Sequence, residues 1–388
     1  MEQRKKRITG FDSLRFLMVF LVIALHSAMT YMEFGVPWWY VIDDHKSLFF
    51  TFVVVFFDSF PMSVLFFLAG YFAVPSFDKR GTALFLKDKL LRLGLPWVLG
   101  VFLVAPVLAR STMTALGFPP PDALTFITQF FFGPFYQQGP YWFLGILLFF
   151  MVLFAVISAL FKNAGLGPEK QNNKPGSRPW IILTILWIVS VLTYYLSGRF
   201  VKPAVDWLNA GYILYFQPSR IAGYLLVFAA GLLGWRKRWF TGGGWSPNVF
   251  FWGTGSFVSA AFLLYIKFFI APFRSELFGL VSESFTYNAT ALSMTFFLTA
   301  FFSKSRNFSY KVIKYFEADA YGIYWLHMLI LMPMLYLLKP LSIPIALKWV
   351  FSLPATVLVC SLLLRCGRRV WTKSLLFFVQ TLHFLPFR

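Results

Sequence analysis

The chain has 388 residues, of which 59% are hydrophobic, 21% aromatic and only 13% charged, and its mean hydropathy is +0.69. A soluble domain would carry nearly twice this charged fraction, so the composition excludes a soluble protein and indicates a polytopic integral membrane protein. The formal charge of +20 does not indicate nucleic-acid binding, because the basic residues lie at the ends of apolar runs, where anionic lipid and topology explain them.

Apolar windows near 20 residues long predict an all-α fold with about ten transmembrane helices, in one domain over residues 1–388. The windows are 10–32, 48–74, 90–109, 140–161, 180–197, 217–234, 247–270, 286–303, 318–338 and 343–364. Lysine and arginine residues concentrate in every second connecting segment, beginning with the N-terminal one. This alternation follows the positive-inside rule and predicts that both termini are cytoplasmic.

The first window carries three ionisable residues on one helical face. Asp12 and Arg15 are three residues apart, and His26 follows Arg15 by eleven residues. Eleven residues return almost to the same azimuth, about 16 Å further along a helix. Charges at membrane depth are costly, so this stripe predicts a polar cavity with His26 as a proton acceptor. The alternative is a neutral histidine bonded to a neighbouring helix.

The second and third windows add one acidic residue and a pair of cations. Asp58 lies inside 48–74, where it could pair with a histidine or arginine of a cavity or form a structural bond. Lys89 and Arg92 share a helical face where the third window leaves the cytoplasm, and two cations there could clamp a phosphate or diphosphate. Ordinary anchoring at the membrane boundary is the other interpretation.

Two later windows also contain polar residues at membrane depth. Arg220 lies near the outer end of the sixth window, where it either serves a site or extends its head to the interface. His327 lies near the middle of the ninth window with Tyr324 one turn away, and function and structural bonding are equally open for it. We take both, together with Tyr324 and Asp58, as candidate substrate-binding residues.

Generic catalytic motifs are absent from the sequence. It has no P-loop, no Rossmann glycine pattern and no G-x-S-x-G motif. The spacing of Cys360 and Cys366 fits no metal motif, so we expect two free thiols and no metal site.

Five segments nonetheless resemble, in the same order, the acyltransferase 3 membrane family. These are FDSLRFLMVFLVIALH, FPMSVLFFLAGYF, KDKLLRLGLP, YWFLGILLFF and YGIYWLH. The length and the last segment are most similar to the branch that contains glucans biosynthesis protein C. The resemblance covers nearly the whole chain and implies a fold of ten spans in the plasma membrane, the inner membrane in bacteria.

The resemblance implies transfer of an acyl group, of acetyl or succinyl type, from cytoplasmic acyl-CoA to a hydroxyl of a carbohydrate or similar envelope acceptor. It implies no tightly bound cofactor and leaves a homo-oligomer open. His26, Arg15 and Asp12 are then the expected catalytic residues, and the family's R-x-x-R donor site corresponds to Lys89 and Arg92.

Three positions depart from the family pattern. Lys89 replaces the first Arg of the donor pair, which keeps the charge but loses bidentate geometry. Ala69–Gly70 replaces the usual Ser-Gly, and Pro61 stands where an Arg is common. Two other functions stay open from the sequence: a transporter or flippase for a lipid-linked or anionic solute, and a non-catalytic accessory subunit.

Overall fold

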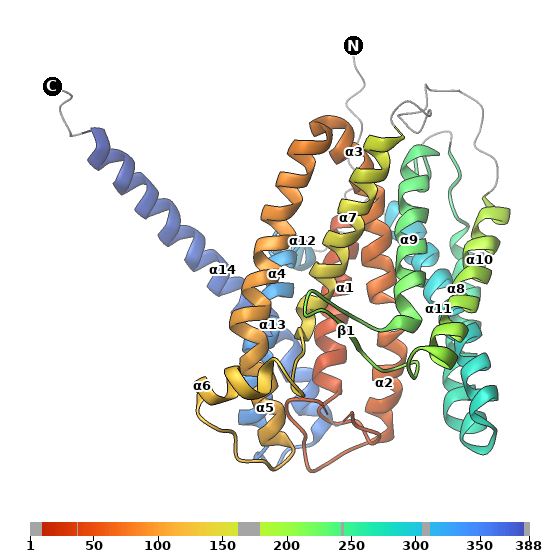
Figure 1. Ribbon diagram of the computed structural model, residues 1–388, viewed down its shortest axis with the longest axis horizontal. Helices are drawn as coiled ribbons and strands as arrows, with labels where there is room; N and C mark the ends of the chain where they lie inside the picture. Colours follow the sequence, from red (N-terminus) through yellow and green to blue (C-terminus); the bar gives the residue numbers. More distant parts are fainter. Residues whose placement is uncertain (1–9, 37, 162–178, 242–243, 305–310, 384–388) are drawn as a thin grey trace.

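The computed structural model describes residues 10–36, 38–161, 179–241, 244–304 and 311–383, and these form a bundle of helices (Figure 1). The main helices are α1 (Gly10–Ala28), α2 (Leu48–Asp58), α3 (Pro61–Lys89), α7 (Trp142–Leu160), α8 (Trp180–Phe200), α9 (Pro218–Arg236), α10 (Val249–Tyr265), α11 (Glu276–Lys304), α13 (Ala320–Leu338) and α14 (Ile345–His383). Within the described residues the strands are β1 (Leu208–Ala210) and β2 (Leu214–Phe216), an antiparallel hairpin in which Leu208 pairs with Phe216.

Shorter helical segments connect these elements. They are the π-helix η1 (Leu90–Gly94), α4 (Leu95–Leu99), the π-helix η2 (Gly100–Val104), α5 (Ala105–Ala115), α6 (Ala123–Thr125), the π-helix η3 (Phe126–Phe131), the 3₁₀ turn η4 (Gly139–Tyr141), the π-helix η5 (Ile266–Ile270), the 3₁₀ turn η6 (Ala271–Phe273) and α12 (Lys311–Glu317).

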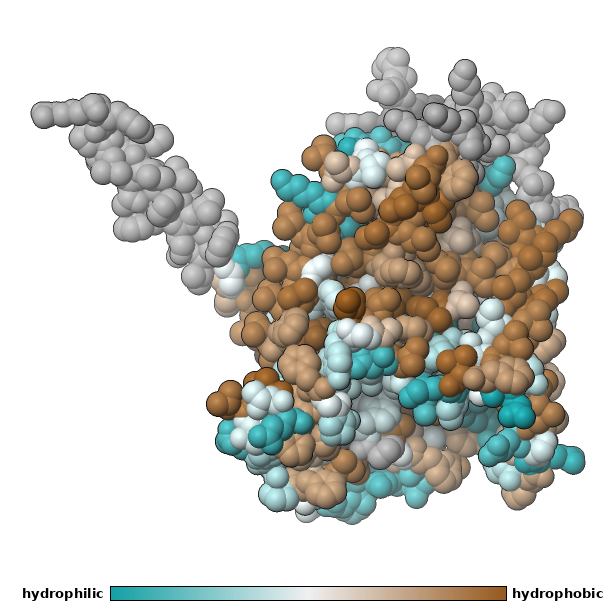
Figure 2. Space-filling view, in the orientation of Figure 1, coloured by the Kyte–Doolittle hydropathy of each residue, from teal (hydrophilic) through white to brown (hydrophobic). Residues whose placement is uncertain are grey.

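The fold class is confirmed as an all-α polytopic membrane protein. In the described part of the chain, eight helical segments are long and apolar enough to cross a membrane. One of them, Leu48–Ala115, contains two runs of opposite direction, because the chain reverses at Gly81 with φ 71° (Figure 1). The 29-residue helix α11 packs along α10 as a further membrane-length helix. Figure 2 shows a broad hydrophobic surface between more polar ends. The count of ten spans and the cytoplasmic termini stay predictions.

The apolar window 48–74 contains a break between two helices. α2 ends at Asp58, and α3 begins only at Pro61, with Ser59 and Phe60 between them. Ser59 closes the end of α2 by donating from its backbone N–H and its hydroxyl to the Phe56 carbonyl. Proline fits the first turn of a helix because its missing N–H is not needed there, so Pro61 favours a new start. The break leaves Asp58 at a helix end inside the bundle.

Among the described helices, α3 and α9 share the most extensive contact, and two glycines make their close approach feasible. A Cβ at Gly70 would lie 2.1 Å from the Phe228 carbonyl oxygen, and one at Gly231 would lie 2.2 Å from the Phe67 carbonyl oxygen. Small residues at such interfaces let backbones approach and gain packing energy in lipid. This close approach requires glycine at position 70, next to Ala69, which departs from the family pattern.

We expect Gly70→Ala to separate α3 from α9, because overpacking a tight interface costs about 1–3 kcal/mol. Thermal unfolding of the purified protein should show a lower melting temperature and a lower folded yield. Gly367→Ala is the control, since nothing lies within 4 Å of a Cβ built there. Equal melting temperatures for the two variants would contradict the proposed close packing.

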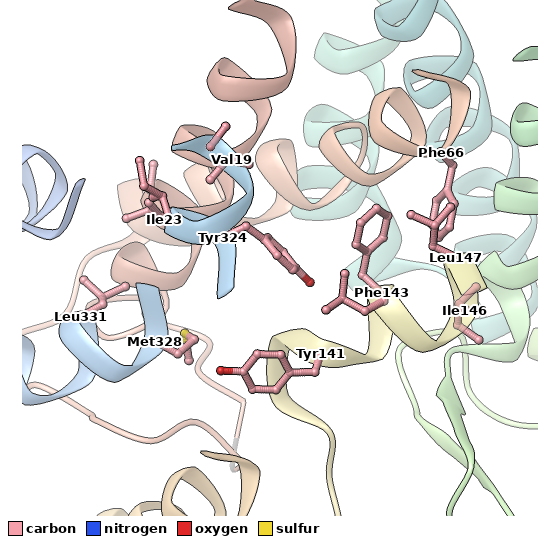
Figure 3. Packing of buried hydrophobic residues seen from close by; sticks show 14 of the residues in the cluster. Val19, Ile23, Phe66, Tyr141, Phe143, Ile146, Leu147, Tyr324, Met328 and Leu331 are labelled. Atoms are coloured by element: carbon pink, nitrogen blue, oxygen red, sulfur yellow. The ribbon is translucent and has the colours of Figure 1, made fainter. Parts of the chain in front are cut away.

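The main core includes side chains of α1, α3, α7 and α13 (Figure 3), and α2, α9 and α14 also contribute to it. Its aromatic contacts run from Phe66 to Phe143, with ring centroids 4.8 Å apart, and from Phe143 to Tyr324, at 5.7 Å. Figure 3 shows the labelled side chains that fill this region: Val19, Ile23, Phe66, Tyr141, Phe143, Ile146, Leu147, Tyr324, Met328 and Leu331. This packing fixes α1 against α13, the two helices that carry the predicted histidines.

Candidate active site

A charged cavity of about 300 Å³ lies where α1 meets the part of α3 that follows its reversal at Gly81. Its lining contains the cationic side chains of Arg15, Arg80, Lys89 and Arg92, the acidic side chains of Asp12 and Asp88, and the uncharged side chains of Phe72 and Ser76. The turn at Gly81 brings these side chains together, because it folds the segment that carries Asp88, Lys89 and Arg92 back beside Arg80. Arg80 and Asp88 were not among the predicted site residues, since only the reversal places them there.

Asp88 organises the cations of this pocket. Its carboxylate lies 2.8 Å from Arg92 Nε, 3.3 Å from Lys89 Nζ and 3.7 Å from Arg80 Nη1. The side chain of Arg92 is 71% exposed, so its guanidinium is accessible from outside the bundle. A pocket with this excess of positive charge is suited to an anion such as a phosphate group.

Asp12 and Arg15 belong to the same pocket. Arg15 donates to the Asp12 carboxylate at 2.8 Å, and its guanidinium lies 4.5 Å from the centre of the Phe72 ring. The aromatic face and the carboxylate together hold the guanidinium in one orientation. The structure therefore groups Asp12 and Arg15 with Lys89 and Arg92. By helix rise, Arg15 lies about 16 Å along α1 from His26.

His26 contacts the other predicted histidine directly. His26 Nδ1 lies 3.0 Å from His327 Nε2, and the two ring planes differ by only 2°. His327 is completely buried, and its Nδ1 lies 2.5 Å from the Tyr324 carbonyl oxygen. Trp39, in the segment after α1, stacks beside His26 with centroids 5.5 Å apart. The sequence marked each histidine separately but gave no signal that they meet across 301 positions.

The hydrogen-bond chain assigns the tautomers of the neutral pair. The Tyr324 carbonyl can only accept, so His327 Nδ1 carries its hydrogen and His327 Nε2 presents a lone pair. His26 Nδ1 must then donate to His327 Nε2, which leaves the lone pair of His26 on Nε2. This is the arrangement of a general base whose second nitrogen is oriented by a partner.

The segment before α7 supports α13 next to the histidines. The Tyr324 hydroxyl donates to the Pro140 carbonyl, and the Tyr141 hydroxyl donates to the Trp325 carbonyl at 2.9 Å. In Figure 1, α7 rises from near the middle of the bundle, so this connection reaches deep into the molecule. The hydroxyl of Tyr324 is therefore engaged by the backbone, while its carbonyl orients His327.

Asp58 and Arg220 form a second polar centre. Arg220 Nη2 lies 2.6 Å from the Asp58 carboxylate, and its guanidinium is 4.7 Å from the centre of the Tyr287 ring. Only 5% of the Arg220 side chain is exposed, so the interpretation that it extends to the interface was wrong. Of the alternatives left open for Asp58, the structure shows an ion pair with an arginine. A cavity of about 20 Å³, large enough for one water, adjoins Arg220.

The two polar centres are not bonded to each other. No hydrogen bond between the described residues connects Asp58 or Arg220 with either histidine. Among the described residues, no group of three His, Cys, Asp or Glu side chains could hold a metal ion. Cys360 is buried, Cys366 is exposed, and both are free thiols.

The fold and the site define a polytopic membrane protein with a histidine pair and a cationic pocket, each of which includes residues of the first helix. The chain belongs to the acyltransferase 3 family, because the family model described as an acyltransferase domain matches residues 8–365, nearly the whole chain. It is thus a membrane enzyme, an acyltransferase that transfers groups other than aminoacyl groups. The curated proteins and the solved structures that were searched gave no match.

Proposed function

We propose that the protein is an O-acyltransferase that takes an acetyl- or succinyl-type group from cytoplasmic acyl-CoA and transfers it to a hydroxyl of a carbohydrate or similar acceptor. One observation carries the proposal: α1 contributes Arg15 to a cationic pocket and holds His26, oriented by His327, about 16 Å further along. The extended pantetheine arm of CoA suits this separation, with its phosphates on the cations and its thioester near His26.

The chemistry then follows from the tautomers. As the acceptor oxygen attacks the thioester carbonyl carbon, its proton moves to His26 Nε2. The tetrahedral adduct collapses, the carbon–sulfur bond breaks, and the imidazolium returns the proton to the leaving thiolate. His327 accepts the His26 Nδ1–H bond throughout, and it thereby holds the ring and stabilises the positive charge that forms on it.

The charged residues of the two polar centres support a binding position for the donor and one for the acceptor. The cationic pocket contains residues that the positive-inside rule assigns to the cytoplasm, which supports a donor site on that face, in the inner membrane of a bacterium. Trp39 is 2% exposed and packs beside His26, so it supports the His26 ring from within the core. Asp58, with 42% of its side chain exposed, could accept hydrogen bonds from acceptor hydroxyls while Arg220 holds it.

Mass spectrometry tests this proposal in purified protein. Acetyl-CoA and succinyl-CoA are each supplied to proteoliposomes together with glucose oligomers, and the products are searched for an ester on the sugar. Ester that forms only when the CoA faces the side of the cationic pocket supports the proposal. Absence of both ester formation and acyl-CoA consumption, with folded protein, would contradict it.

One observation favours a second function, a transporter or flippase for an anionic or lipid-linked solute. Broken helices and ion pairs within the helix bundle, as at Asp58 and Arg220, also build the binding sites of carriers. The same proteoliposomes separate the two functions, since a carrier would move labelled substrate across the membrane without forming an ester.

The cationic pocket leads to a prediction for donor affinity. We expect Lys89→Ala and Arg92→Ala each to weaken CoA binding about ten- to a hundredfold, because a charge-assisted hydrogen bond contributes about 1.5–3 kcal/mol. Isothermal titration of CoA into purified variants measures this loss, which should be similar for acyl-CoA. Lys89→Arg should bind well, because it restores the bidentate group.

Lys87→Ala is the matched control for that experiment. Lys87 is an exposed cation on the same helix, and it does not line the cavity. An equal effect of Lys87→Ala would show that only the general charge of this end matters. Unchanged affinity in the Lys89→Ala/Arg92→Ala double variant would remove the pair from the donor site.

A further inference from the structure

The third membrane run, from η1 to η2, is underwound and contains a proline. π-Helical turns cover Leu90–Gly94 and Gly100–Val104, with Pro96 between them. Proline has no N–H, so the Arg92 carbonyl loses the donor that an α-helix would supply four residues later. π-Helical segments often mark functional positions, because they expose backbone groups and shift the register of a helix.

Helix α13 supplies a replacement donor. The Tyr321 hydroxyl donates to the Arg92 carbonyl oxygen at 2.5 Å. One turn further along, Trp325 Nε1 donates to the Pro96 carbonyl oxygen at 2.9 Å. Because the donors are four residues apart on α13 and the acceptors four apart on the third run, the two bonds fix one helix against the other at a single register.

These two bonds join the two halves of the candidate active site. Arg92 contributes its side chain to the cationic pocket and its carbonyl to Tyr321. Trp325 lies two residues before His327, and its own carbonyl accepts the bond from Tyr141. A movement of the third run along its axis would therefore change the position of the pocket relative to the histidine pair.

We propose that Tyr321 and Trp325 are positioning residues that set the distance between the donor pocket and the His26–His327 pair. The inference rests on the proposed function, since it assumes that the donor's phosphates bind at Arg92 while its thioester reacts at His26. A thioester held by its distant phosphate end arrives at the base only if the two helices keep their register. Misplacement of reacting groups by about 1 Å can reduce a rate by about a hundredfold.

Tyr321→Phe and Trp325→Phe test the proposal, because each removes one donor and keeps an aromatic ring. We expect kcat, normalised to the number of CoA-binding sites measured by calorimetry, to fall about ten- to a hundredfold. The affinity for CoA should stay within about twofold of wild type, since the cationic side chains remain. The pH dependence of the residual activity should be unchanged, because the histidine pair is intact.

Tyr336→Phe is the matched control. Tyr336 is on the same helix, 65% exposed, and none of the hydrogen bonds between described residues involves its hydroxyl. A merely structural role for Tyr321 and Trp325 predicts fewer CoA-binding sites with wild-type kcat per site, and that result would overturn the inference. Reduced CoA affinity with unchanged kcat would also overturn it. Failure of the wild-type protein to bind CoA would instead reject the proposed function itself.

Discussion

His26→Ala should reduce acyl transfer by about 10²–10⁴-fold, the usual contribution of a general base, while the protein stays folded. The reason is the assigned tautomer, in which the lone pair of His327 Nε2 already accepts from His26, so that the free lone pair of the histidine pair is on His26 Nε2. The measurement is ester formation at saturating acyl-CoA, with CoA affinity determined in parallel. Affinity should change little, because the cationic pocket is about 16 Å away along the helix.

A graded effect at His327 completes this prediction. His327→Gln keeps an acceptor that can face His26 Nδ1, whereas His327→Leu leaves that N–H buried without a partner. We therefore expect the glutamine variant to retain more activity than the leucine variant. His26→Ala activity within threefold of wild type would reject the base assignment. Equal activity of the two His327 variants would reject the orienting role of that residue.

The Asp58–Arg220 pair should show a large and asymmetric effect on stability. Removing one member of a buried ion pair typically costs about 3–5 kcal/mol, because the remaining charge has no compensation. Arg220 is 5% exposed, whereas Asp58 is 42% exposed. Asp58→Ala should therefore be the more destabilising change, since it leaves a buried guanidinium, while Arg220→Met leaves a carboxylate that water can reach.

Thermal unfolding of four variants checks the asymmetry. The double variant Asp58→Ala/Arg220→Met should recover much of the stability lost in Asp58→Ala, because it buries no charge. Arg199→Ala is the control, an exposed arginine on α8 that is expected to change the melting temperature little. A smaller loss in Asp58→Ala than in Arg220→Met would contradict the assignment of Arg220 as the buried charge.

The sequence identified individual residues of the candidate site better than it identified the residues that they contact. Polar residues inside apolar windows are conspicuous because each is costly in lipid, so His26, His327, Asp58 and Arg220 could be identified individually. Helical periodicity also placed Asp12 and Arg15 on one face, and the structure shows their bond. The helical membrane fold followed from window lengths alone.

The pairings depend on helix packing, which periodicity does not encode. His26 meets His327 only because α1 and α13 are neighbours, and Arg80 joins the cationic pocket only because the chain reverses at Gly81. The break after Asp58 was missed for a related reason. Hydropathy is continuous through 48–74, so the apolar pattern conceals a local change of direction whose signal is the Ser59–Pro61 sequence.

Asp88 gives the cationic pocket a property that its net charge does not reveal. Its carboxylate already engages Arg80, Lys89 and Arg92, so these three cations have a counter-ion before any ligand binds. At the proposed donor site, the phosphate oxygens of CoA replace the Asp88 carboxylate as the partner of these cations, and the carboxylate stays within reach. The affinity for the donor then depends on how much more strongly the cations bind the donor phosphates than they bind the Asp88 carboxylate. Because the carboxylate stays nearby, it assists the departure of CoA after each turnover.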